Sequence, residues 1–172
     1  MSAIPPTRPD IVAFMALAAN ALGVPSLPAP KDIFNFSGDD AALADEKLLL
    51  AIQGKKSATT SWPIPDPLYW GPGDLSVILD GQGRPGAVMR TLSFVTCLFK
   101  DVEEEFALAE AEGDYQSYRD GHVWFYNQVQ EAKKPVGERR VFGDESLVLC
   151  ERFEVIYPVW RGEEEVDGEV VV

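Results

Sequence analysis

One stretch decides how this chain is interpreted: Gly54-Lys55-Lys56-Ser57-Ala58-Thr59-Thr60-Ser61-Trp62. Gly54 has the position of the residue that follows a helix C-terminus, where glycine adopts a left-handed conformation at little cost. The residues from Ser57 to Trp62 are typical of a short strand, because threonine and tryptophan suit a pleated surface. On a regular strand Lys56 and Thr59 point to opposite faces, so their side chains converge only if the chain turns between them.

Two interpretations of this stretch stay open from spacing alone. In the first, Lys55 and Lys56 interact with the last carbonyls of the preceding helix, and the hydroxyl groups lie on an exposed strand face. In the second, the same lysines and hydroxyls line a binding site.

Composition indicates an ordinary globular chain. It has 172 residues, 46% of them hydrophobic and 25% charged, which is enough for one core. No apolar run is long enough to span a membrane, and the first residues lack the features of a secretory signal. Cys97 and Cys150 have neither a disulfide-framework pattern nor a metal-site spacing, so we expect them reduced and in the core. We therefore expect a cytoplasmic protein.

The formal net charge of −13 is concentrated in two places, residues 101–114 and the acidic end at 161–172. Proteins that bind long nucleic acids usually present a basic face, because phosphate neutralisation supplies much of the affinity. Outside Lys55/Lys56 and the basic residues of 133–140, no basic run is evident. The expected partners are therefore a small nucleoside-like substrate or a short RNA, with no membrane and no extended duplex; the oligomeric state is not indicated.

Helical spacing and turn signals predict the elements. We expect helices from Pro9-Asp10 to Leu22, from a Ser37 cap to Gly54, over 100–110, and over 115–131 with a buried side made of Tyr118, His122, Phe125 and Val129. We expect strands over 57–62, 75–79, 87–97 and 147–157, with an Asp80-Gly81-Gln82-Gly83 hairpin turn. The last strand is nearly apolar on both faces, which predicts a central position.

Several short motifs occur in a fixed order over residues 34–158: Phe34-Asn35-Phe36 with Asp39-Asp40, Gly54 to Ser61, Gly73-Asp74, Glu110 to Asp114, Arg119 to His122, and Cys150 to Val155. In this order they resemble the ASCH domain family, part of the PUA-like superfamily. Two positions depart from its pattern: Ala111 replaces a glycine that is usual there, and Tyr118 stands where many relatives have tryptophan. The resemblance implies an α+β fold, a small, partly open PUA-like β-barrel with helices packed around its mouth. It divides the chain into an N-terminal helical extension (1–33), the ASCH domain (34–160) and an acidic, mobile tail (161–172).

The resemblance also implies an activity. Some members of the family are amidohydrolases that remove the acetyl group from N4-acetylcytidine, using a lysine, a threonine and a glutamate of the matched pattern. By position these are Lys56, Thr59 and Glu112. The candidates for binding substrate around them are Gly54, Lys55, Ser57, Thr60, Ser61, Trp62, Asp114, Arg119 and His122.

The chemistry of these residue types fits amide hydrolysis. A threonine hydroxyl becomes a nucleophile when a base takes its proton, and a lysine is that base only where desolvation lowers its pKa. Glu112 would orient the lysine or relay a proton, but its negative charge would raise the lysine pKa and oppose the base role. Ser57, Thr60 or backbone N–H groups after Gly54 would stabilise an oxyanion. For Arg119 we favour pairing with Asp114 over binding a phosphate.

The alternatives stay open at this point. Lys56 and Glu112 form either a site or a structural ion pair, and Thr59 is either a nucleophile or an ordinary strand residue. His122 is either a satisfied core residue or a catalytic base, and Trp62 either stacks on a base or covers the barrel end. A second function is an RNA-binding PUA-like module, with or without weak ribonuclease or regulatory activity, in which Lys55 and Lys56 contact phosphate. No metal-ligand spacing is present, so neither a metal nor a cofactor is expected.

Overall fold

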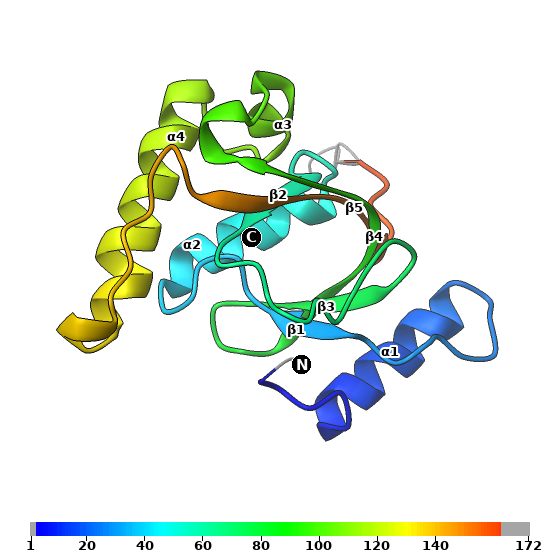
Figure 1. The fold of residues 1–172 in the computed structure, drawn as a ribbon. Helices are drawn as coiled ribbons and strands as arrows, with labels where there is room; N and C mark the ends of the chain where they lie inside the picture. The colour runs from blue at the N-terminus through cyan, green and yellow to red at the C-terminus, as the bar shows by residue number, and fades with distance from the viewer. Residues whose placement is uncertain (1–2, 163–172) are drawn as a thin grey trace, which may run out of the picture.

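The computed structural model describes residues 3–162, and the centre of the described part is a five-stranded sheet (Figure 1). The strand order is β1-β3-β4-β5-β2, with β1 parallel to β3 and the other neighbours antiparallel. The strands are β1 (Asp32–Phe34), β2 (Ala58–Ser61), β3 (Leu75–Leu79), β4 (Pro85–Leu98) and β5 (Leu147–Tyr157). Because β1 and β2 remain at opposite edges, the sheet forms a half-barrel. The predicted α+β, partly open barrel is confirmed. The central strand is β4, however, and β5, for which we expected that place, is an interior strand next to the β2 edge.

The curvature of the sheet comes from its two longest strands. Register shifts between β4 and β5 occur at Val88/Met89 and at Thr91/Ser93. Such bulges insert an unpaired residue, bend the strand and increase its twist. A 14-residue β4 is therefore able to pair with β3 at one end and with β5 along most of its length.

Four α-helices surround the half-barrel: α1 (Pro9–Ala21), α2 (Ala41–Ile52), α3 (Glu104–Ala109) and α4 (Tyr115–Trp124). Figure 1 shows α3 and α4 at one end, with α1 at the other. Short 3-10 helices form at Phe99–Asp101 (η1), Glu131–Lys133 (η3) and Val136–Glu138 (η4), and a π-helix follows α4 at Phe125–Gln130 (η2). No helix within residues 3–162 has the length and apolar character that a membrane crossing requires.

Two helix predictions need correction. The predicted helix over 100–110 begins only at Glu104, because Val102 is extended and buries its side chain beside Phe99. In the predicted helix over 115–131, the buried side is Tyr118, His122 and Tyr126, not Phe125 and Val129. Residues four apart share this face, and the wider π-helical turn continues it.

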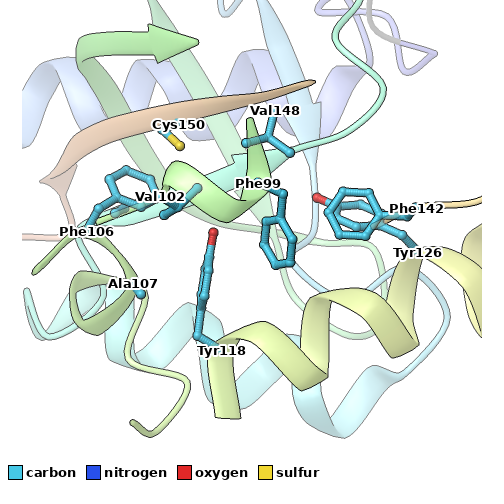
Figure 2. Close-up of a cluster of buried hydrophobic side chains, with 10 residues drawn as sticks. Phe99, Val102, Phe106, Ala107, Tyr118, Tyr126, Phe142, Val148 and Cys150 are labelled. Carbon is cyan, nitrogen blue, oxygen red and sulfur yellow. The ribbon is translucent and has the colours of Figure 1, made fainter. Parts of the chain in front are cut away.

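Three buried clusters hold the elements together. The first joins α3, α4 and β5 around Phe99, Tyr118 and Phe142 (Figure 2). The second seats α1 on the sheet, where Ile11 and Met15 meet residues of β1, β3 and β4. The third packs α2 against β3, β4 and β5.

The terminal segments and the cysteines complete the fold. The N-terminal extension, predicted as residues 1–33, contributes helix α1, which packs against the sheet. Most of the predicted tail, residues 163–172, lies outside the described residues. Cys150 is buried, Cys97 is half-buried, and both are free thiols with their sulfur atoms 4.0 Å apart.

Candidate active site

A cavity of about 430 Å³ opens between α2, β2, the turn after α3, and α4. Its walls bring together segments that are far apart in the sequence, around residues 36–60 and 110–126. Its lining is mixed, with aromatic side chains such as Phe36 and Tyr126 and charged ones such as Lys56 and Glu112. A concave, partly apolar site with a few convergent charged groups is typical of small-molecule binding.

Lys56 is the central cation of this cavity, and the end of α2 explains its direction. Gly54 has a φ of 72°, and the N–H groups of Lys55 and Lys56 both donate to the carbonyl of Leu50. This reversal of the chain turns the Lys56 side chain inward, and only 1% of its surface is exposed. Its Nζ donates to the backbone oxygen of Glu110 at 3.1 Å and to the carboxylate Oε2 of the same residue at 3.3 Å.

Two carboxylates face Lys56 because of an unusual backbone at Ala111. That residue has a φ of 58°, the only positive φ among non-glycine residues of the described chain. The left-handed turn ends α3 and directs both Glu110 and Glu112 into the cavity. Glu110 is buried, whereas Glu112 keeps 18% of its side chain exposed and pairs with Lys47 at 2.5 Å and with Lys56 at 3.9 Å.

His122 completes the charged cluster. Its Nδ1 lies 2.8 Å from the carbonyl oxygen of Tyr118 and 3.7 Å from Oε2 of Glu112, and its Nε2 lies 3.6 Å from Oε2 of Glu110. Burial alone lowers the pKa of His122, but the negative charge of Glu110 and its hydrogen bonding, with the charge of Glu112, outweigh burial and raise it. Because both ring nitrogens face acceptors, the imidazolium form suits this position.

The pKa of Glu110 is shifted the other way. Burial raises it, but the charges of Lys56 and His122, with hydrogen bonds from His122 and Thr60, outweigh burial and lower the pKa below its usual range. Glu110 is therefore a carboxylate that stays ionised, and it anchors Lys56 and His122 in place.

Hydroxyl groups of β2 and α4 support this carboxylate. Thr60 Oγ1 donates to Oε1 of Glu110 at 2.5 Å, and the Tyr118 hydroxyl lies 2.8 Å from the same Oγ1. The Tyr126 hydroxyl donates to the backbone oxygen of Thr60 at 2.8 Å. Figure 2 shows Tyr118 reaching from α4 towards the sheet. Burial and then the charge of Glu110 raise the pKa values of both tyrosines, so they remain neutral donors.

Several predicted site residues meet in the cavity: Lys56, Thr59, Thr60, Glu112 and His122 all line it. Thr59 and Thr60 differ in orientation, because Thr60 pairs across the strands with Cys150 and Thr59 with Glu151. Thr60 is tied to Glu110, whereas the Thr59 hydroxyl makes no hydrogen bond to the described part of the chain.

Other predicted site residues lie outside the cavity lining: Gly54, Lys55, Ser57, Ser61, Trp62, Asp114 and Arg119. Arg119 pairs with Asp144, not with Asp114 as we expected, and packs over the Phe99 ring. Asp114 instead caps α4 by accepting the N–H of Ser117 at 2.8 Å. Trp62 packs edge-on against Tyr126 and Phe142, which agrees with a covering role.

Glu110, Lys47 and Ser37 also line the cavity, although none of them is among the predicted site residues. The signal for Glu110 was present, since it stands two residues before Glu112 in the same acidic corner. Lys47 is recognisable only once α2 is placed beside that corner. The predicted Ser37 cap is wrong, because Asp40 caps α2 by accepting the N–H of Leu43 at 3.0 Å.

The cluster contains three groups able to bind a metal, Glu110, Glu112 and His122, whose ligand atoms lie within 4.8 Å of one another. Lys56 and Lys47 already occupy positions beside both carboxylates. The two lysines therefore balance the negative charge of the carboxylates. That the site works without a metal stays a prediction.

The sequence model of the ASCH domain matches residues 33–157 of the chain. The chain belongs to the ASCH domain family. It is similar to the crystal structure of a protein from Enterococcus faecalis, with 24% identity and a TM-score of 0.69 over 85% of this chain and 92% of that one. It is also similar to the crystal structure of an ASCH domain from Lactobacillus crispatus, with 23% identity and a TM-score of 0.62 over 72% and 79% of the two chains. Because both identities are below 25%, the structural similarity establishes only the fold of this ASCH domain. The comparison with curated proteins found no match.

Proposed function

We propose that this ASCH domain is an amidohydrolase that acts on a small acylated pyrimidine nucleoside of the N4-acetylcytidine kind. The observation that supports the proposal is the buried cluster of Lys56, Glu110, Glu112 and His122 in one cavity. Its volume of about 430 Å³ lies within the range of about 300–1,000 Å³ that is usual for small-molecule sites.

Each group has a role in acyl transfer. The ammonium group of Lys56 donates to the amide oxygen and stabilises the oxyanion that forms there. The Thr59 hydroxyl, which has no competing hydrogen bond to the described chain, attacks the amide carbon, and Glu112 accepts its proton. Glu112 suits the base role better than Glu110, because it is the more exposed carboxylate.

The leaving group and the second half of the reaction use the same residues. The imidazolium of His122 gives a proton to the departing exocyclic nitrogen, which releases cytidine and leaves the acyl group on Thr59. Neutral His122 then takes a proton from water, the water attacks the ester, and protonated Glu112 returns its proton to Thr59. The products are cytidine and a carboxylic acid, and every proton is accounted for.

The test is to follow cytidine release from N4-acetylcytidine by the parent protein and by Lys56→Ala, Thr59→Ala, Thr59→Ser and Glu112→Gln. We expect kcat/KM to fall by about 10²–10³ without Lys56 or Thr59, and by about 10² without the Glu112 base. Thr59→Ser should retain most activity. Ser61→Ala, on the same strand but outside the cavity, is the matched control. No turnover by the parent protein would reject this substrate, and full activity of Thr59→Ala would reject the covalent route.

The RNA-binding alternative depends on Lys55 and Lys56 contacting phosphate. Lys55 is exposed, but Lys56 is buried and paired with Glu110. A lysine held in this way is poorly placed to reach a phosphate backbone, which favours the small substrate. RNA binding stays a prediction, to be tested by the salt dependence of short-RNA affinity.

A further inference from the structure

Gly121 stands in the interior of α4, a position where alanine is more stable than glycine. Glycine is needed in a helix where the backbone is left-handed or where a neighbouring group leaves no room for a Cβ. Neither condition holds here. The φ of Gly121 lies outside the left-handed region, and beyond its chain neighbours and its own helix backbone a Cβ would meet no atom of the described chain within 4 Å.

The open space beside Gly121 belongs to the cavity. Gly121 lines this cavity, as do His122, the next residue, and Trp124, about one turn further along α4. Residues three apart lie on the same side of a helix, and helical side chains lean towards the helix N-terminus. The indole of Trp124 therefore lies alongside the turn that contains Gly121, and the cavity wall there consists of bare helix backbone next to a large aromatic side chain.

Trp124 is the aromatic side chain of this wall that has no partner. Its exposed fraction is 60%, and in the described part of the chain its indole makes neither a ring contact nor a hydrogen bond. The other aromatic rings of the lining pack against neighbouring rings, for example Phe36 against Phe153 and Phe125 against Tyr126. A free aromatic face is a surface on which a nucleobase stacks.

We propose that the pyrimidine ring of the substrate lies against the backbone of Gly121 and stacks on the indole of Trp124, so that these two residues determine specificity for the ring. This inference rests on the proposed function, because that function supplies the ring. A planar ring reaches contact distance of a helix backbone only where no Cβ projects between them, and glycine provides this. A ring bound there lies beside His122, the residue proposed to protonate the exocyclic nitrogen.

The experiment compares the parent protein with Gly121→Ala, Trp124→Ala and Trp124→Phe. One matched control is Gly137→Ala in η4, where a Cβ also has free space, and the other is Trp160→Ala, at a second exposed tryptophan. Neither control residue lines the cavity. Three quantities are measured: kcat and KM for N4-acetylcytidine, the binding constant of cytidine, and the thermal midpoint. Cytidine keeps the ring but lacks the acyl group.

We expect Gly121→Ala to weaken cytidine binding and to raise KM by about tenfold, because the new methyl group occupies the place of the ring. The same variant should raise the thermal midpoint by about 1–4 °C, because alanine is the better helix former. A structural role for Gly121 predicts the opposite shift of the midpoint. Trp124→Ala should weaken binding by about tenfold with kcat and the midpoint nearly unchanged, and Trp124→Phe should retain most of the affinity.

The outcomes separate the two proposals. If the parent turns over N4-acetylcytidine but either Gly121→Ala or Trp124→Ala binds cytidine as its control does, the inference fails and the proposed function stands. If the parent binds cytidine without turnover, and both variants weaken that binding, the proposed function fails and the inference stands. If Gly121→Ala lowers the thermal midpoint together with binding, the glycine serves folding and the inference is overturned. If the parent binds neither compound at millimolar concentration, both proposals are overturned.

Discussion

Replacing Lys56 by methionine is the most direct test of how the charged cluster is held. Lys56 and Glu110 are 1% and 2% exposed, and their charged atoms lie 3.3 Å apart. Removing one partner of a buried ion pair costs about 3–5 kcal/mol, because the other charge is left uncompensated. Glu110 keeps its contacts with Thr60 and His122 in the variant, so we expect a loss near the lower end, about 3 kcal/mol.

The measurement is urea unfolding of four proteins: the parent, Lys56→Met, Glu110→Gln and the double variant. The double variant contains neither charge of the pair, so its loss should be smaller than the sum of the single losses by about 2 kcal/mol or more. Lys55→Met is the matched control, because Lys55 is the exposed neighbour, and its unfolding midpoint should not change. If the double variant lost as much stability as the two single variants together, the coupling would be refuted. The description of Lys56 as the cation that balances Glu110 would then be refuted as well.

Two further predictions concern the same site. Ala111→Gly should raise the free energy of unfolding by about 0.5–1 kcal/mol. Glycine removes the strain of the left-handed backbone, and this gain exceeds the cost of the entropy that glycine adds to the unfolded chain. A thermal midpoint equal to or below that of the parent would contradict this. For His122→Gln, the stability advantage of the parent should be full below pH 6.5 and decline as the pH rises through the raised pKa, because the contribution belongs to the protonated ring. Unfolding measured from pH 5 to 9 checks it, and an advantage that grows above pH 7 would show that neutral His122 is the stabilising form.

The order of helices and strands was largely predictable because the signals are local. Pro9-Asp10 begins α1, Gly54 ends α2, and the predicted strand over 147–157 agrees with β5. What the sequence did not indicate depends on tertiary packing. The three residues of β1 form a strand only because β3 offers a parallel edge. The π-helix after Trp124 likewise has no composition signal.

In the candidate site, too, the local signals were predictable from the sequence, and the contacts that depend on tertiary packing were not. Of the stretch from Gly54 to Trp62, Lys56, Thr59 and Thr60 line the cavity, but strand alternation does not reveal which hydroxyl faces which acid. That choice is made by cross-strand register, which assigns Thr60 to the face of Cys150 and Glu110. Arg119 was misassigned for a related reason: helical spacing gives its face, but the partner Asp144 comes from the loop before β5.

Unfavourable local features gather around this cavity. Ala111 holds a left-handed backbone, Lys56 is a buried lysine, Ser37 keeps an unpaired hydroxyl, and a π-helix begins at Phe125. All four lie in or line the same cavity. A buried ion pair is weak evidence for stability, since apolar residues of similar volume often do as well or better. Where several local rules are broken together, a functional site is the usual cause, and π-helical turns are frequent at such sites. The concentration of these features is what a ligand-binding site predicts, and it therefore supports the function proposed above over a purely structural role for the cluster.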